Sequence, residues 1–392
     1  MTDATTAAER VPSSPANRRF YELDLLRFVA AVEVMMFHYT IQGYSLGLST
    51  VDFTAMGLAL EYFYFGVEML FVLSGFVILK SVQQKSALGF LSTRFVRLGP
   101  TYWICVTLTA LVLLVANSNQ PPIDLGSYFA NLTMAASVFG YEHIDGVYWT
   151  MEVQLVFYAW VFLVCLMRQI HNADKFLGLW LLATIFINVF GGLTFTKLDY
   201  LLLPKLSCYF IAGAVFFLIY QRGRSLYLWS MVAACYAMAI GLALSGSLSE
   251  NPAADVVGNT LLFALFARIV THGKGIQGRP WMVTLFKMTY PLYLIHQRVG
   301  YVLLSKFDGH IPKYVLLVAV IAIMLLTSLG IATQVDAWVM PPVKKAVNRV
   351  LQMAERPHTK PLSKPKPSMA AAIEYAIPTE AENQYAELTI DR

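Results

Sequence analysis

The sequence predicts an all-α fold, a polytopic integral membrane bundle of about ten transmembrane helices. Of its 392 residues, 57% are hydrophobic and 14% are charged, whereas a soluble domain carries roughly 25% charged residues. Apolar stretches of about twenty residues, long enough to cross a bilayer as a helix, recur along nearly the whole chain. A spanning segment must satisfy its backbone hydrogen bonds internally, and the short alternating segments of a β-barrel do not occur, so the stretches predict helices.

Ten apolar segments follow one another with short connections between them. We expect helices over residues 22–41, 60–79, 100–116, 148–167, 177–194, 203–220, 226–245, 256–270, 283–304 and 314–339. No connection is long enough to hold a second folded domain, and no repeat of a solenoid type is found. The sequence therefore predicts one membrane domain.

Two polar segments flank this domain, which we place at residues 21–340. Residues 1–20 form a cytoplasmic N-terminal tail that lacks the basic-then-apolar order and small-residue cleavage site of a signal peptide. The first apolar segment is therefore predicted to be a retained helix. Residues 341–392 begin with a basic stretch and become rich in Pro, Lys, Ser and Glu, a composition typical of a disordered tail.

The distribution of Lys and Arg predicts the orientation. Basic residues gather in alternate connections, such as residues 80–97, whereas residues 42–59, 117–147 and 246–255 contain none. The positive-inside rule then places both termini in the cytoplasm. The same rule accounts for the net charge of +5, so we expect no nucleic-acid partner. Four lysines break the pattern: Lys197, Lys205, Lys306 and Lys313.

The cysteines carry no sign of a metal site. All four lie within apolar segments and none has CxxC spacing, so we expect buried thiols and no metal. These are Cys105, Cys165, Cys208 and Cys235.

The first predicted helix carries two ionisable residues on one face. Arg27 and His38 lie eleven residues apart, which is close to three turns and about 16 Å along the axis. Ionisable residues within a membrane helix are costly and therefore indicate function. The alternative is an Arg that reaches toward lipid phosphate and a His that is hydrogen-bonded for packing.

Two further arginines precede the third predicted helix. We place Arg94 and Arg97 in the loop before that helix, where their spacing favours a bidentate anion site. Together with Arg27 they predict a phosphate-binding cluster, and ordinary positive-inside charge is the alternative. The neighbouring pair Ser74 and Gly75 would let a ligand or another backbone approach closely, with helix packing as the alternative.

Two more polar sites lie in the fourth and ninth predicted helices. Glu152 could orient or polarise a histidine, or could cap the helix within an aromatic belt. His296 shares a helix face with Tyr293 and is either a site residue or a packing residue. The other membrane carboxylates, Glu33, Glu61 and Glu68, form no recognisable motif.

Taken together, these segments resemble the acyltransferase-3 family of membrane-bound O-acyltransferases. Five motifs occur in the family's order between about residues 20 and 339: Arg27-x10-His38, Leu-Phe-Val-Leu-Ser-Gly-Phe at 70–76, Arg94-x-x-Arg97, Trp-Thr-Met-x-Val from Trp149, and Tyr-Pro-Leu-Tyr-Leu-x-His from Tyr290 to His296. One position departs from the family pattern. Gln154 stands where the family often has Glu, and Glu152 lies two residues earlier.

The resemblance implies a donor and a chemistry. The donor would be acyl-CoA, most simply acetyl-CoA, with its phosphates on Arg27, Arg94 and Arg97 beside Ser74, and no permanently bound cofactor. Its pantetheine arm is about half a bilayer long, so a thioester could reach His38. His38 would be the catalytic base, with Glu152 and His296 as further catalytic candidates. Direct transfer and a relay through acyl-His are both open.

The resemblance also implies an acceptor and a location. The acceptor would be a hydroxyl of an extracytoplasmic carbohydrate, such as an exopolysaccharide, an O-antigen or a lipo-oligosaccharide, at the bacterial cytoplasmic (inner) membrane. The lipid bilayer is the surrounding partner, and a homo-oligomer is compatible with this arrangement. The alternatives are a transporter or exporter of a glycan or acyl compound, which would often show an internal repeat that we do not find, and an inactive scaffold.

The predicted orientation can be tested with single cysteines in a cysteine-free background. We expect a cysteine at Ser86 to resist an impermeant thiol reagent in intact cells and one at Ser118 to react, because the two lie on opposite sides of the membrane. Labelling of the first, or no labelling of the second, would refute the orientation.

Overall fold

The computed structural model describes residues 20–53, 55–56, 60–83, 85–116, 123–190, 200–247, 251–272 and 276–355. The predicted tails, Ser118 and Lys197 lie outside these residues, apart from the first part of the C-terminal segment. The described residues contain helices and turns and no strand, which confirms the predicted all-α fold. Residues 1–347 form one compact unit and residues 348–392 a second. The arrangement described below is that of the first unit.

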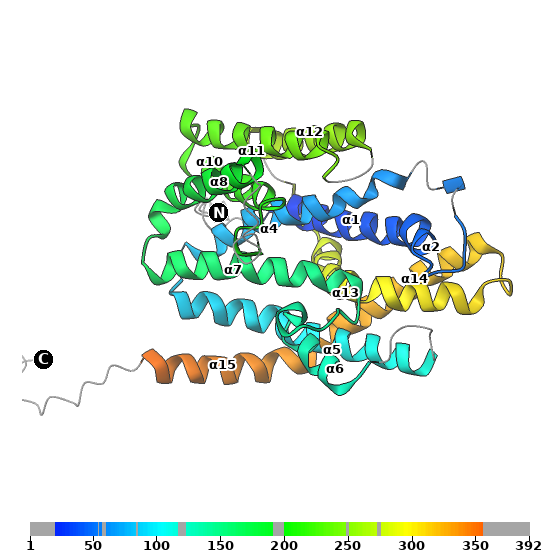
Figure 1. Ribbon diagram of the computed structural model, residues 1–392. Coiled ribbons are helices and arrows are strands. Elements are labelled where there is room, and N and C mark those ends of the chain that lie inside the picture. Colours follow the sequence, from blue (N-terminus) through cyan, green and yellow to red (C-terminus); the bar gives the residue numbers. More distant parts are fainter. Residues whose placement is uncertain are drawn as a thin grey trace, which may run out of the picture. The chain divides into compact units, whose positions relative to one another are not determined.

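Each of the ten predicted segments corresponds to a helix (Figure 1). They are α1 (Tyr21–Phe37), α4 (Gly66–Val82), α5 (Ala87–Ala116), α7 (Trp149–Leu166), α8 (Ala173–Phe190), α10 (Ser207–Arg222), α11 (Leu226–Leu244), α12 (Pro252–His272), α13 (Pro280–Phe307) and α14 (Lys313–Gln334). The shorter helices are α2 (Gly43–Ser45) and α6 (Leu125–Leu132). The described residues also contain four 3-10 turns, η3 (Glu61–Phe65), η4 (Ala136–Phe139), η5 (Gly146–Tyr148) and η6 (Ile170–Asn172), and two π-helical turns, η2 (His38–Gln42) and η7 (Val335–Val339). The last helix is α15 (Met340–Glu355).

Eight helical segments in the described chain are long and apolar enough to cross a membrane. Two of the ten predicted segments, α1 and α13, are not among them. Both carry polar groups in their interiors: Glu33 in α1, and Gln297 and Arg298 in α13. These two less apolar helices pack directly against each other.

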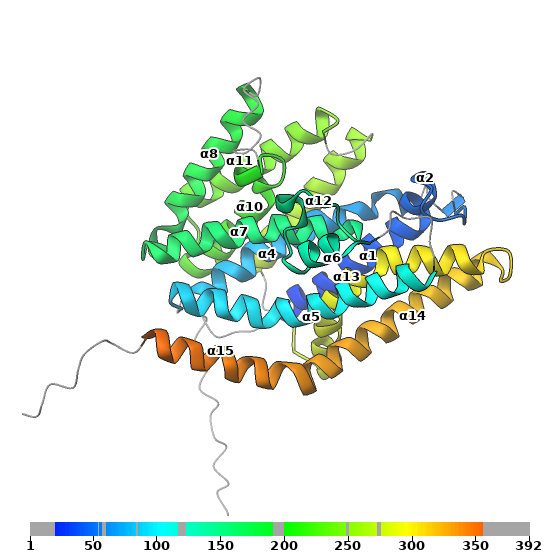
Figure 2. The same ribbon diagram turned by 60° about the horizontal axis from the view of Figure 1, so that its bottom comes forward.

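The helices of the first unit form two groups with α1 and α4 between them (Figures 1 and 2). On one side α10 packs against α8, α11 and α12, and on the other α13 packs against α5 and α14. Contacts run from α10 to α4, from α4 to α1 and from α1 to α13. The apolar side chains follow this division, because one buried cluster surrounds α4 and α10 and another surrounds α1 and α13.

The closest approach in the bundle is between α4 and α10. A Cβ atom placed on Gly213 would lie 1.9 Å from the backbone oxygen of Val72, and one on Gly75 would lie 2.1 Å from that of Phe210. Only glycine leaves room for two helix backbones at this separation. Gly75 therefore has the packing role that was one of the two alternatives for the Ser74–Gly75 pair.

The prediction that Arg94 and Arg97 lie in a loop is wrong. Both are within α5, which begins at Ala87 and continues through Pro100. A proline in a helix removes one backbone hydrogen bond and does not require the helix to end there. Arg also has a good helix propensity, and the buried Phe90 and Arg94 pack this first part of α5 into the unit. Basic charge at a membrane boundary therefore does not distinguish a loop from a helix end.

The α4–α10 contact predicts that alanine destabilises the protein at Gly213 but not at a glycine with open space around it. Gly213→Ala should lower the free energy of unfolding by about 1–3 kcal/mol, because overpacking forces two backbones apart. Gly241→Ala in α11 is the matched control, since a Cβ there meets nothing within 4 Å. Thermal denaturation in detergent, followed with a thiol-reactive dye that reads exposure of the buried Cys208, measures both. A melting temperature of the Gly213 variant equal to the wild-type value would refute the close contact.

Candidate active site

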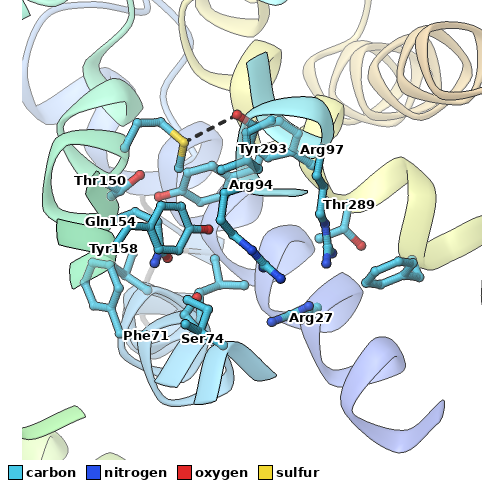
Figure 3. Close-up of a pocket in the computed structure, with 17 residues that line it drawn as sticks. Arg27, Phe71, Ser74, Arg94, Arg97, Thr150, Gln154, Tyr158, Thr289 and Tyr293 are labelled. Carbon is cyan, nitrogen blue, oxygen red and sulfur yellow. Dashed lines mark hydrogen bonds between the residues drawn. The ribbon is translucent and has the colours of Figure 1, made fainter. Parts of the chain in front are cut away.

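Three arginines from two helices line one small cavity, which we call the arginine cavity. Arg27 comes from α1, Arg94 and Arg97 come from α5, and the cavity has a volume of about 130 Å³. Ser74 of α4 is also in its wall. The structure therefore brings together all four residues that were predicted to bind the donor. Figure 3 shows the guanidinium groups of Arg94 and Arg97 pointing toward Arg27.

The arginines are held by neutral groups. Arg27 Nη2 donates to the backbone oxygen of Leu73 at 3.2 Å, and Arg94 Nη2 donates to Ser81 Oγ at 2.8 Å. The Arg97 guanidinium lies 4.8 Å from the ring centre of Phe286. Among the described residues none of the three forms an ion pair within 4.0 Å, and the buried Arg94 Nε has no hydrogen-bond partner. Three like charges with one spare donor give this cavity the chemistry to bind an anion.

Gln154 adds a further donor to the same cavity. It is buried in α7, lines the arginine cavity, and its Nε2 has no hydrogen-bond partner in the described chain. An amide at this position is neutral and can donate, whereas a carboxylate would be negative and could only accept. The departure from the family pattern therefore makes the cavity more favourable to an anion.

A second and larger cavity contains His38, and we call it the histidine cavity. Its volume is about 1040 Å³. Its polar wall includes Gln42, Glu68, Lys205 and Gln297. Glu68 belonged to no motif in the sequence, and Lys205 was one of the lysines that broke the charge pattern. Nothing in the sequence explained the positions of these two side chains, and the structure places both in the wall of this cavity.

His38 and His296 are in direct contact. His38 Nδ1 lies 2.8 Å from His296 Nε2, and both side chains are buried. His296 Nδ1 faces the backbone oxygens of Tyr293 at 2.9 Å and Leu292 at 3.2 Å. A carbonyl oxygen can only accept, so His296 Nδ1 carries the hydrogen and His296 Nε2 is an acceptor when the ring is neutral. His38 Nδ1 must then donate, which leaves the lone pair on His38 Nε2.

Hydrogen bonds between the same two helical segments fix this pair. The Tyr39 hydroxyl donates to the backbone oxygen of His296 at 2.7 Å, and Gln297 Nε2 donates to Gln42 Oε1 at 3.0 Å. His38 also opens η2, where the helix widens into a π-helical turn. Such turns occur frequently at functional sites because they redirect side chains. The two histidines therefore have a defined orientation.

The two cavities meet inside the bundle. Val67 and Tyr293 line both of them. Arg27 of α1 lines the arginine cavity and His38, in the η2 turn that continues α1, lines the histidine cavity, while along α4 the two cavities are lined by Ser74 and Glu68. The cavities are therefore displaced along the helix axes and adjoin at Val67 and Tyr293.

Glu152 lies apart from the histidine pair. Its two carboxylate oxygens accept hydrogen bonds from Ser137, from the backbone N–H at 2.8 Å and from the hydroxyl. His143 Nε2 is 3.7 Å from Glu152 Oε1. Burial lowers the pKa of His143, and the Glu152 carboxylate acts in the opposite direction. Glu152 thus holds the connection between α6 and α7, and the structure does not bring it to either cavity.

Asp145 is a residue that the sequence analysis missed. It is completely buried, and its carboxylate accepts from the backbone N–H of Val147 at 3.2 Å and from that of Arg298 at 3.0 Å. These bonds attach η5 to α13 two residues after His296. The signal in the sequence was an Asp shortly before Trp149, at the position of a helix N-cap.

Comparison with known protein families gives one match, the acyltransferase domain family, over residues 20–333. The chain belongs to the acyltransferase-3 family. The matched region contains both cavities of this acyltransferase. Comparisons with curated proteins and with solved structures gave no match.

Proposed function

We propose that this acyltransferase moves an acyl group, most simply acetyl, from cytoplasmic acyl-CoA to a hydroxyl of an extracytoplasmic carbohydrate. The observation that carries the proposal is the unprotonated Nε2 of His38, in a cavity that adjoins three arginines. We place the protein in the bacterial cytoplasmic membrane with both termini in the cytoplasm. The acceptor would be an exopolysaccharide, an O-antigen or a lipo-oligosaccharide.

The arginine cavity supports a coenzyme A donor. Coenzyme A carries several phosphates, and Arg27, Arg94 and Arg97 offer guanidinium groups that form no ion pair within 4.0 Å among the described residues. The cavity is too small for the whole cofactor, so it would hold the part nearest the pantetheine arm. That arm is long and thin, and it would pass Val67 and Tyr293 to present the thioester to His38.

The chemistry follows from the tautomer of the histidine pair. His38 Nε2 takes the proton of the acceptor hydroxyl while the oxygen attacks the thioester carbonyl. The new C–O bond forms, the C–S bond breaks, and the coenzyme A thiolate leaves with the proton that His38 returns. His296 accepts from His38 Nδ1 and stabilises the charge that develops on that ring.

A two-step relay would use the same nitrogen. His38 Nε2 would attack the thioester first, and an acceptor hydroxyl would then receive the acyl group from the histidine. Incubation of the protein with acetyl-labelled acetyl-CoA, in the absence of an acceptor, distinguishes the two routes. The relay would leave the label on the protein, whereas direct transfer would not. In either route Glu152 acts as a positioning residue, because it fixes the connection that leads into Trp149 and α7.

The donor site predicts the effect of removing each arginine. Arg94→Ala and Arg97→Ala should each weaken acyl-CoA binding about tenfold to a hundredfold, because a charged hydrogen bond contributes about 1.5–3 kcal/mol. Binding of coenzyme A to detergent-purified protein, measured by calorimetry, checks this. Arg224→Ala is the control, since Arg224 is exposed and lines neither cavity. Unchanged affinity in both cavity variants would show that these arginines serve orientation alone.

The histidine pair predicts two losses of different kinds. His38→Ala should reduce acyl transfer by about 10²–10⁴, the usual contribution of a general base. His296→Ala should reduce it less and change the pH profile, because His38 then loses the acceptor that fixes its tautomer. Product formation across pH, with His310→Ala in an exposed turn as the control, measures this. An inactive His296 variant beside a nearly normal His38 variant, at equal expression, would reverse the assignment.

A further inference from the structure

Two side chains in the wall of the histidine cavity each carry a buried oxygen atom that has no hydrogen-bond partner among the described residues. These atoms are Glu68 Oε2 and Gln297 Oε1, on side chains that are 8% and 6% exposed. A buried acceptor without a donor costs roughly 1–3 kcal/mol, so native proteins leave few of them. Two such atoms on side chains of one cavity wall indicate a ligand that supplies the missing donors.

These two side chains flank the helix that carries His38. Glu68 lies in the first turn of α4 and Gln297 in α13, and α1 packs against both helices. The orientation of the Gln297 side chain is set by its bond to Gln42 Oε1. A ligand in this cavity that faces His38 Nε2 would therefore have one acceptor residue from α4 and one from α13 in the surrounding wall.

The chemistry of the two atoms defines the ligand. Both accept, so the ligand must present donors next to the hydroxyl that reacts. A simple alcohol has one hydroxyl and can satisfy only one partner, whereas a sugar ring carries hydroxyls on neighbouring carbons. Each neighbouring hydroxyl can donate to an oxygen of the wall while the central one loses its proton to His38.

We propose that Glu68 and Gln297 are acceptor-binding residues, which select a polyol with hydroxyls on adjacent carbons, such as a saccharide ring, over a compound with a single hydroxyl. This inference rests on the proposed function and specifies its acceptor site. In the transfer step Glu68 exchanges no proton and only receives a hydrogen bond. The proton of the reacting hydroxyl goes to His38 and then to the coenzyme A thiolate.

The test compares methyl α-D-glucopyranoside with 1-propanol as acceptors for acetyl-CoA. Wild-type protein should show at least a tenfold lower KM for the glucoside, and the glucoside should raise its melting temperature. Glu68→Gln keeps the size of the side chain but replaces one acceptor oxygen with a donor, so the KM for the glucoside should rise at least tenfold and the thermal shift should disappear. Glu68→Asp, which keeps the carboxylate, should recover part of both effects.

Glu33→Gln is the matched control, because Glu33 is a membrane carboxylate of α1 that lines neither cavity. It should keep the wild-type preference and thermal shift. Wild-type protein that does not distinguish the two acceptors, or a Glu68→Gln variant that keeps the preference, overturns the inference. Thermal stabilisation by the glucoside that depends on Glu68, without any turnover of acetyl-CoA, would retain the binding site and refute the proposed function.

Discussion

The hydrogen bond between His38 and His296 is the interaction on which the rest of the site depends. It joins α1 to α13, and the bonds of Tyr39 and Gln42 to the same helix reinforce it. Two backbone carbonyl oxygens fix the hydrogen on His296 Nδ1, so His296 Nε2 must accept from His38 Nδ1. The lone pair of His38 is therefore on Nε2. A single buried contact thus joins the two helical segments and sets the tautomer of His38.

The site contains polar groups, which the interior of a membrane disfavours, and the fold places several of them on α1 and α13, the two less apolar helices of the ten. Eight segments are apolar enough to cross a bilayer, whereas α13 and the η2 turn that continues α1 carry the histidines, and α1 and α13 lie against each other. The arginines are likewise held by carbonyl, hydroxyl and aromatic neighbours. A buried charge that has no ion-pair partner within 4.0 Å among the described residues is costly, so this arrangement would favour a bound anion.

Periodicity and composition predicted the helices well, because a membrane helix must be long, apolar and internally hydrogen-bonded. Helix geometry also predicted that Arg27 and His38 share a face, and the structure places them in two adjoining cavities. The contact of His38 with His296 could not be predicted, because it joins residues 258 positions apart. Glu68 was unexplained for the same reason, and the extent of α5 was misjudged because charge marks a membrane boundary without showing whether the chain there is helical.

The position of Val67 and Tyr293 bears on the membrane as well as on the reaction. Two cavities joined by a wide opening within one membrane protein would form a conduit for ions. A branched aliphatic side chain and a buried aromatic ring line both cavities where they adjoin. If a donor and an acceptor enter from opposite sides, as proposed, they would meet at these side chains, which would limit the leakage of ions along the same path.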